Sequence, residues 1–145
     1  MDKEIKILSE SDCSNLMSLA IEAREKTYCR YSNYSVGAAL LASDGTVYIG
    51  CNIENSSYSA TVCAERTAFF KAISDGKRDF RAIAISGGKK GSESDKICSP
   101  CGICRQVMSE FCGDDFEIIL GNKQNIKKYT LSELMPLRFE LKDIT

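Results

Sequence analysis

The sequence contains no histidine among its 145 residues. This absence excludes Ser-His-Asp and Cys-His catalysis, because both need an imidazole as the general base. It also excludes histidine-ligated zinc and mixed Cys/His zinc fingers. Any transition-metal site in this chain must therefore be built from thiolates and carboxylates.

Long apolar runs are missing as well. No stretch approaches the roughly 18 consecutive apolar residues that a membrane-spanning helix needs. The N-terminal residues 1–4 are polar and lack the apolar core of a secretory signal peptide. We therefore expect a cytoplasmic protein with no membrane partner.

Neither sign of charge dominates, since 19 basic residues stand against 20 acidic ones and the net charge is −1. The basic residues form no tract longer than the lysine pairs at residues 89–90 and 127–128. Proteins that bind nucleic acid usually carry a basic surface that neutralises phosphates. The balance favours a small-molecule substrate and no nucleic-acid partner.

The length and composition predict one globular domain over residues 1–145, because 43% of the residues are hydrophobic and 27% are charged. The chain also has eight cysteines. Without a secretion signal, these are expected to be reduced thiols and metal ligands rather than a disulfide framework.

Hydrophobic periodicity predicts a series of alternating helices and strands. Helices are expected over residues 11–29, 63–73, 100–111 and 130–134, and strands over residues 35–41, 47–53, 80–85 and 116–120. An Asp-Gly pair at residues 44–45 predicts that the first two strands form a hairpin. Residues 87–96, rich in Gly, Ser and Lys, are expected to form a mobile loop. The order of elements indicates an α/β fold with a mixed sheet between helices.

Two short cysteine motifs carry the chemistry. Cys63 lies in Thr-Val-Cys-Ala-Glu-Arg, and Cys101 and Cys104 lie in Ser-Pro-Cys-Gly-Ile-Cys-Arg. Each motif opens an expected helix, whose partial positive N-terminus offsets thiolate charge. Three thiolates can hold one Zn²⁺ and leave its fourth position open, which is typical of catalytic zinc because a water bound there loses a proton near neutral pH.

A carboxylate and a guanidinium follow the first of these cysteines. Glu65 lies two residues after Cys63, and in the first turn of a helix both side chains can reach the same space. A carboxylate there can take a proton from water and deliver it to a ring nitrogen and a leaving amine. Arg66, together with Arg105 in the second motif, is a candidate hydrogen-bond donor to the thiolate sulfurs.

A structural zinc site is the alternative that the spacing leaves open. Cys98 precedes Cys101 and Cys104 at the same interval of three residues, so it is a candidate fourth ligand of a closed site. Glu65 would then be a solvated carboxylate at a helix start. The four other cysteines, at positions 13, 29, 51 and 112, are expected to be small core residues.

The two motifs together resemble the zinc signature of cytidine deaminases, in the small homotetrameric class that uses three cysteines. The quoted stretches are Cys-Ala-Glu-Arg-Thr-Ala at 63–68 and Ser-Pro-Cys-Gly-Ile-Cys-Arg-Gln-Val at 99–107, and the resemblance extends over residues 28–139. It implies that Cys63, Cys101 and Cys104 bind the zinc. It also implies that Glu65 shuttles protons and that Arg66 hydrogen-bonds the thiolates.

The same resemblance implies a set of substrate contacts. Asn52 and Glu54 match the residues that hold the ribose hydroxyls. Tyr34 stands where the family has a phenylalanine that packs near the pyrimidine, and Arg30 stands where the family usually has proline. Phe139 aligns with an aromatic residue that reaches the active site of a neighbouring subunit.

The implied fold is a three-layer cytidine deaminase-like sandwich, with a five-stranded mixed sheet between helices. The implied assembly is a homotetramer with shared active sites. The implied reaction is hydrolytic deamination of cytidine and 2′-deoxycytidine in pyrimidine salvage. Two alternatives remain: a deaminase of another cytosine compound, such as a nucleoside antibiotic or a base within nucleic acid, and a non-catalytic zinc-binding module.

Overall fold

The computed structural model describes residues 7–95 and 97–141, and the polar residues 1–4 lie outside this part. Its elements are α1 (Glu10–Ala23), a 3-10 turn (Arg24–Lys26), β1 (Tyr34–Ala42), β2 (Val47–Cys51), a 3-10 turn (Tyr58–Ala60), α2 (Ala64–Ser74), β3 (Phe80–Lys89), α3 (Gly102–Phe111), β4 (Glu117–Gly121), β5 (Ile126–Thr130) and α4 (Leu131–Leu134). None of the helices in the described ranges is long and apolar enough to span a membrane.

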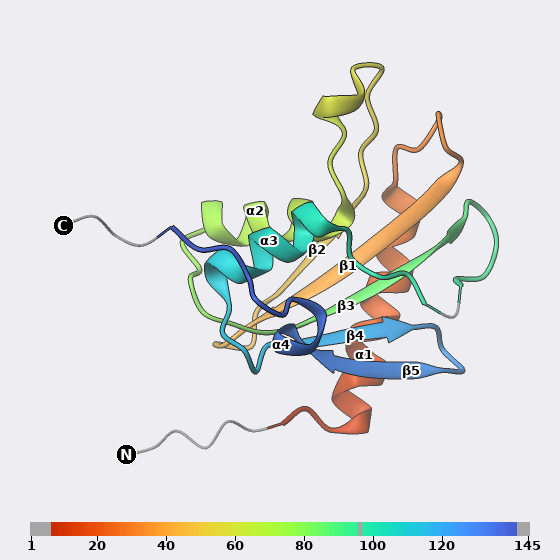
Figure 1. Cartoon of the computed structure of the whole chain (residues 1–145). Helices are drawn as coiled ribbons and strands as arrows, with labels where there is room; N and C mark the ends of the chain where they lie inside the picture. Colours follow the sequence, from red (N-terminus) through yellow and green to blue (C-terminus); the bar gives the residue numbers. More distant parts are fainter. Residues whose placement is uncertain (1–6, 96, 142–145) are drawn as a thin grey trace, which may run out of the picture.

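The strands form one mixed sheet in the order β2-β1-β3-β4-β5. Strands β3 and β4 are parallel, and all other neighbours are antiparallel. The predicted hairpin is confirmed, because β1 and β2 pair from Leu41 with Val47 to Gly37 with Cys51. The parallel β3–β4 pair is connected through α3, which brings the second cysteine motif onto one face of the sheet (Figure 1).

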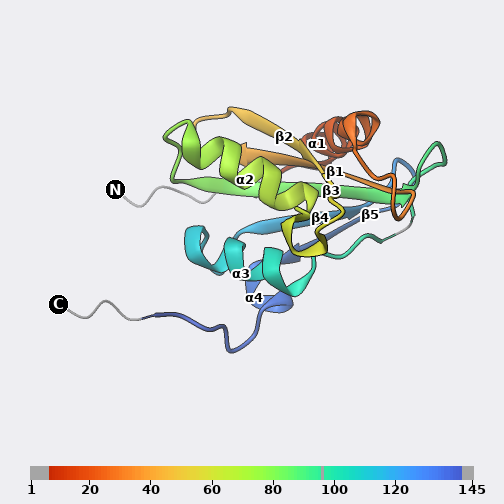
Figure 2. The ribbon, with the colours of Figure 1, turned by 90° about the horizontal axis from the view of Figure 1, so that it is seen from above.

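Helices cover both faces of this sheet. Helix α1 runs behind the strands in Figure 1, whereas α2 and α3 lie in front of them, and Figure 2 shows the same arrangement from above. Side chains alternate along the central strands, so that Leu40 packs toward α2 and its neighbour Ala39 packs toward α1. The α/β class indicated by the pattern of elements and the five-stranded mixed sheet implied by the resemblance are therefore confirmed.

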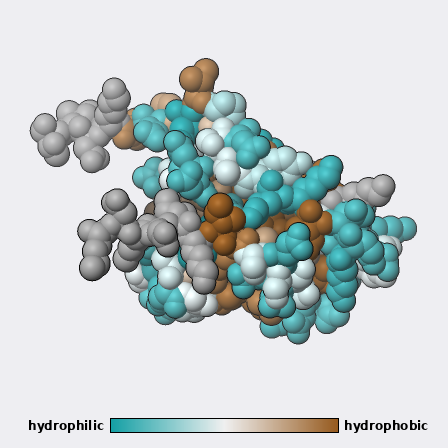
Figure 3. All heavy atoms as spheres, turned by 90° about the horizontal axis from the view of Figure 1, so that it is seen from below, coloured by the Kyte–Doolittle hydropathy of each residue, from teal (hydrophilic) through white to brown (hydrophobic). Residues whose placement is uncertain are grey.

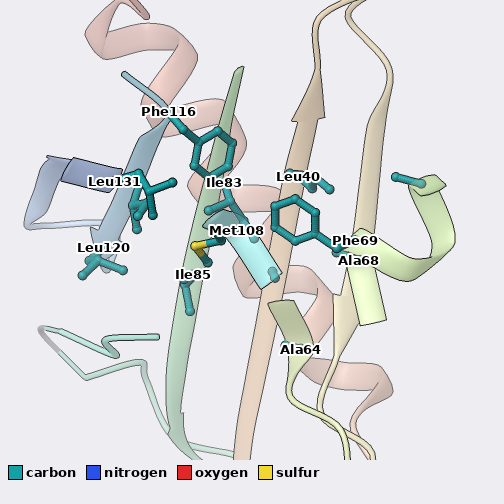
Figure 4. Packing of buried hydrophobic residues seen from close by; sticks show 13 residues of the cluster. Leu40, Ala64, Ala68, Phe69, Ile83, Ile85, Met108, Phe116, Leu120 and Leu131 are labelled. Atoms are coloured by element: carbon teal, nitrogen blue, oxygen red, sulfur yellow. The ribbon is translucent and has the colours of Figure 1, made fainter. Parts of the chain in front are cut away.

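Phe69 is the largest side chain of the core between the sheet and α2 and α3, and it is fully buried. Its ring lies 5.2 Å from that of Phe80 in an edge-to-face arrangement, and it also packs near Phe111 and Phe116. Figure 4 shows it projecting from α2 toward the strands, with Met108 of α3 in the same cluster. This packing joins the two helices whose first residues carry the cysteines.

Helix α2 lies unusually close to β2. A Cβ atom at Gly50 would lie only 2.5 Å from the carbonyl oxygen of Ala64 and 2.6 Å from the backbone nitrogen of Ala68. Glycine is therefore required here, because any side chain would push the helix outward. The close approach holds the first turn of α2, and with it Cys63, against the end of β2.

The fifth strand, β5, was not among the strands that hydrophobic periodicity predicted. It is an edge strand of five residues, Ile126–Thr130, that contains two exposed lysines and pairs antiparallel with β4. Edge strands are often short and charged, which weakens their apolar alternation. Its pairing with β4 decides the structure of this segment.

Several predicted boundaries were wrong: β2 ends at Cys51 and not at residue 53, α3 begins at Gly102 and not at residue 100, and two boundaries differ by more. Strand β3 continues through Lys89, into the stretch predicted to be a loop, because residues 86–89 pair with residues 34–37 of β1. The first helix ends at Ala23 and not at residue 29, since a 3-10 turn follows it. Its start is capped by Ser9, whose hydroxyl accepts a hydrogen bond from the Asp12 backbone in a capping box.

Candidate active site

Three thiols converge where α2 and α3 begin. The sulfur atoms of Cys63, Cys101 and Cys104 all lie within 4.8 Å of one another, and those of Cys63 and Cys101 are 3.7 Å apart. Cys104 is buried, Cys63 is partly exposed and Cys101 is exposed. The cluster is therefore open to solvent on one side.

The spacing of these sulfurs fits zinc. Sulfurs bound tetrahedrally at about 2.3 Å from Zn²⁺ lie roughly 3.8 Å from each other. The separation of 3.7 Å between Cys63 and Cys101 matches this value. Three soft sulfur donors also suit zinc better than magnesium or calcium, which prefer oxygen. The donor set and its geometry therefore fit a zinc ion.

Both helices present their N-termini to the cluster. Cys63 is the N-cap residue of α2 and Cys101 is the N-cap residue of α3, and neither helix has a side-chain capping hydrogen bond. Cys104 follows within the first turn of α3. The partial positive charge of the two helix ends favours the thiolate forms of these side chains.

Glu65 lies in the first turn of α2 and is only 4% exposed. Burial, followed by the charge of Cys63, raises the pKa of its carboxyl group to about 7. A carboxyl group in this range can both accept and donate a proton near neutral pH. The alternative of a structural zinc site predicts that Glu65 is a solvated carboxylate at a helix start. The burial of Glu65 does not agree with that prediction.

Arg66 contacts the cluster, whereas Arg105 does not. The Nη2 atom of Arg66 donates to the Sγ atom of Cys63 at 3.5 Å. Hydrogen bonds from Cys104, Arg66 and Cys101 lower the pKa of the Cys63 thiol well below its ordinary value, although burial acts in the opposite direction. The Arg105 guanidinium instead donates to the carbonyl oxygens of Pro100 and Leu134 and to the Ser99 hydroxyl.

Cys98 is the candidate fourth ligand. Among the described residues, its sulfur is not part of the group formed by the sulfurs of Cys63, Cys101 and Cys104. Its sulfur packs over Gly87, where a Cβ atom would lie 2.4 Å from it. Burial, followed by the charge of Glu65, raises the pKa of this thiol to about 11, so it is a neutral thiol at ordinary pH. The closed four-cysteine site is not favoured by this arrangement.

Asn52 follows β2 and extends its pairing with β1 through its side chain. Its Oδ1 atom accepts a hydrogen bond from the Val36 backbone at 2.8 Å, and its Nδ2 atom donates to the Tyr34 carbonyl oxygen at 2.9 Å. The side chain is 9% exposed. These contacts hold the amide rigidly and leave one of its two N–H bonds for another partner.

Glu54 lies two residues after Asn52 and accepts hydrogen bonds from the segment before β1. Its Oε1 atom accepts from the backbone of Tyr31 and Ser32, and its Oε2 atom accepts from the Ser32 hydroxyl at 2.5 Å. The hydroxyl bond is the main reason that the pKa of Glu54 is lowered. Sequence reasoning missed Ser32, because its role depends on a segment 22 residues away.

A hollow of about 270 Å³ adjoins Glu54. It is lined by Tyr31 and Ser32 and by Tyr58 and Thr61. Tyr58 and Thr61 belong to residues 53–62, which form a narrow loop that projects from the end of β2 (Figure 1). An isolated antiparallel β-bridge between Ile53 and Val62 joins the two ends of this loop.

The two aromatic residues of the predicted site lie in different surroundings. Tyr34 begins β1, and its hydroxyl donates to the Oδ2 atom of Asp95 at 2.8 Å. Phe139 lies in the segment after α4 and is 65% exposed, while its carbonyl oxygen accepts from the side chain of Gln106 in α3. The ring of Phe139 therefore faces solvent in the single chain.

Comparison with known proteins matches the part of the chain that contains both cysteine motifs. The family model for the cytidine and deoxycytidylate deaminase zinc-binding region matches residues 10–120. A cytidine deaminase of Sporosarcina psychrophila is 50% identical over 135 residues, which are 92% of this chain and 96% of that protein. A cytidine deaminase of Halalkalibacterium halodurans is 50% identical over 134 residues, covering 92% of this chain and 98% of that protein.

A solved structure has the same fold. The crystal structure of cytidine deaminase from Burkholderia pseudomallei superposes with a TM-score of 0.80 at 42% sequence identity. The match covers 91% of this chain and all of that chain. The fold is thus shared along nearly the whole length of both proteins.

Proposed function

The chain belongs to the cytidine and deoxycytidylate deaminase family, and we propose that it deaminates cytidine and 2′-deoxycytidine hydrolytically. The products are uridine and 2′-deoxyuridine, and ammonia is released. One observation carries this proposal: three thiols fit zinc at the N-termini of α2 and α3, with the buried carboxyl group of Glu65 beside them.

We propose that Cys63, Cys101 and Cys104 are the zinc ligands. When bound, zinc supplies a Lewis acid that makes water nucleophilic near neutral pH. Arg66 offsets the negative charge of the thiolates through its bond to Cys63, which preserves the acidity of the metal.

Glu65 is the proposed catalytic acid and base. It takes one proton from the attacking water and delivers it to N3 of the cytosine ring. It then takes the proton of the new C4 hydroxyl, as the C4 carbonyl forms and the C–N bond breaks, and gives that proton to the departing amine. The raised pKa of this carboxyl group supports both roles. The carboxyl group is only 4% exposed, so bulk water has little access to it.

Asn52 and Glu54 are the proposed partners of the ribose hydroxyls. The amide of Asn52 retains one N–H bond, and the Oε2 atom of Glu54 retains acceptor capacity beside the Ser32 hydroxyl. Both groups are held by backbone contacts, so they are oriented before a substrate arrives. Tyr34 is the proposed neighbour of the pyrimidine ring.

We further propose a homotetramer with shared active sites, in which Phe139 reaches a neighbouring subunit. The exposed apolar residues of the C-terminal segment, Leu137, Phe139 and Leu141, support this assembly. On the face seen from below, brown apolar patches lie among a mostly hydrophilic surface (Figure 3). A role in pyrimidine salvage follows from the proposed reaction, and the cytoplasmic location stays a prediction.

The direct test is the ultraviolet change when purified, zinc-loaded protein is mixed with cytidine. Cytidine monophosphate and cytosine serve as matched controls that add a phosphate or remove the ribose. Loss of the cytosine chromophore with cytidine, and not with cytidine monophosphate or cytosine, supports the proposed reaction and the ribose contacts. No change with any of the three, despite bound zinc, would contradict it and return attention to the analogue-deaminase or zinc-module alternatives.

A further inference from the structure

We propose that Asp95 positions the ring of Tyr34 at the nucleoside site, and that the Tyr34 hydroxyl serves this contact and not the substrate. The inference rests on the proposed function, which gives the Tyr34 ring its place beside the pyrimidine. Asp95 touches no reacting atom in this scheme. It acts through Tyr34 and is therefore a positioning residue.

The contact joins two segments that are 61 residues apart in the sequence. The Oη atom of Tyr34 donates to the Oδ2 atom of Asp95 at 2.8 Å. Asp95 is itself anchored, because its backbone N–H donates to the carbonyl oxygen of Gly87 at 2.7 Å. A hydroxyl bound to a carboxylate forms a stronger hydrogen bond than one bound to a neutral acceptor.

The ring is confined at its edge as well as at its hydroxyl. A Cβ atom at Gly87 would lie 3.1 Å from the Cε1 atom of Tyr34 and 2.4 Å from the sulfur of Cys98. The ring edge and the thiol thus share the space that the glycine leaves open. The Tyr34 side chain also hydrogen-bonds the Cys98 thiol, so the thiol is a second neighbour that restrains Tyr34.

The loop that carries Asp95 is also held by contacts that do not involve its carboxylate. The Lys90 backbone N–H donates to the Asn33 carbonyl oxygen at 2.9 Å, and the Ser92 N–H donates to the Lys89 carbonyl oxygen at 3.0 Å. The Asn122 side chain donates to the Ser94 carbonyl oxygen at 3.4 Å. Removing the Asp95 carboxylate should therefore release the Tyr34 hydroxyl, and with it one of the restraints on the ring, without releasing the loop.

The test is a double-mutant cycle of Asp95→Ala and Tyr34→Phe, measured as kcat and KM for cytidine. Each single variant should raise KM about five- to tenfold, because both lose the same charge-assisted bond, while kcat changes less than about twofold. In the Tyr34→Phe background, Asp95→Ala should change KM by less than about twofold. Glu93→Gln, an exposed charge change in the same loop, is the matched control and should leave KM unchanged.

A second measurement does not depend on activity. In protein labelled at the tyrosine ring carbon that bears the hydroxyl, the Tyr34 resonance is identified among six tyrosines by its loss in Tyr34→Phe. Asp95→Ala should shift this resonance, and Glu93→Gln should not. Asp95→Asn, which keeps an acceptor oxygen, should restore part of both the shift and the KM.

Equal KM effects of Asp95→Ala in both backgrounds, or an unchanged Tyr34 resonance, would overturn the positioning role even if cytidine is deaminated normally. A zinc-loaded wild-type protein that leaves cytidine unchanged would instead overturn the proposed function, and the role of Asp95 at a nucleoside site would fall with it. The resonance shift distinguishes these two failures, because it reports the bond itself.

Discussion

The Arg66 guanidinium donates a hydrogen bond from Nη2 to the sulfur of Cys63, across 3.5 Å within the first turn of α2. The Nε atom of the same side chain is buried and has no hydrogen-bond partner among the described residues. Burying part of a guanidinium costs free energy unless its charge is paired with a negative group. Its position next to three thiols gives it such a use, because a positive charge stabilises thiolates.

Replacing Arg66 with alanine should weaken both metal binding and turnover. Without the guanidinium, the pKa of the Cys63 thiol rises and the excess thiolate charge is no longer offset. We expect a loss of about 10- to 100-fold in zinc affinity or in kcat/KM. Competition with a chromogenic chelator measures the affinity, and Arg66→Lys should be intermediate. Wild-type values for Arg66→Ala would show that the bond to Cys63 is dispensable.

Replacing Glu65 with glutamine should strongly reduce turnover while leaving the metal in place. The amide has nearly the same shape as the carboxyl group but cannot accept and return a proton. We expect kcat to fall by about 10²- to 10⁴-fold. Metal analysis should still find bound zinc, and the circular dichroism spectrum should be unchanged. Residual activity near that of the wild type would assign the proton transfers to another group.

Cys101→Ser should lower the zinc content of the protein, whereas Cys98→Ser should not. Cys101→Ser removes one of the three converging sulfurs, so the purified protein should lose most of its zinc and its activity. Cys98→Ser changes a thiol outside that group and should retain zinc after dialysis against a weak chelator. Zinc loss from Cys98→Ser equal to that from Cys101→Ser would revive the closed four-cysteine site.

Truncating Phe69 should destabilise the fold, because its ring fills the core between α2, α3 and the sheet. We expect Phe69→Ala to reduce the free energy of unfolding by about 3–5 kcal/mol. Phe70 is its neighbour on α2 and is 49% exposed, so Phe70→Ala should cost less than about 1 kcal/mol. Urea denaturation of the zinc-loaded proteins compares the two variants. Similar losses for both would mean that Phe70 is covered in the assembled protein.

Shortening Phe139 to alanine should affect the assembly and not the fold of the single chain. Its ring is exposed and its only described hydrogen bond uses the backbone carbonyl oxygen, which the substitution keeps. If Phe139 enters a neighbouring site, Phe139→Ala should raise KM for cytidine. Light scattering should find a tetramer for the wild type. A wild-type monomer with full activity would contradict the shared active site.

The cysteine motifs were predictable because they are local. Cys101 and Cys104 are three residues apart at the start of one helix, and this spacing alone brings their sulfurs to one face. The contact of Cys63 with them was expected from the resemblance and from the chemistry of zinc. By contrast, the contacts of Ser32 with Glu54 and of Asp95 with Tyr34 could not be predicted, because each joins two segments that are distant in the sequence.

The sequence by itself determined the class of chemistry. The lack of histidine restricts a metal site to thiolates and carboxylates, and the periodicity of apolar residues indicates an α/β fold. These inferences depend on residue type and on spacing along the chain, which are visible without coordinates. That the chain forms a single domain over residues 1–145 stays a prediction.

Only the tertiary structure decided which groups meet. Strand β5 exists because β4 offers it an antiparallel partner, and β3 extends through Lys89 because β1 pairs with it there. The burial that raises the pKa of Glu65 requires α2 to be packed on the sheet, which depends on the close approach at Gly50. Hydrogen bonds, burial and charge act through space, so their effect on a residue is set by the folded neighbours and not by its place in the sequence.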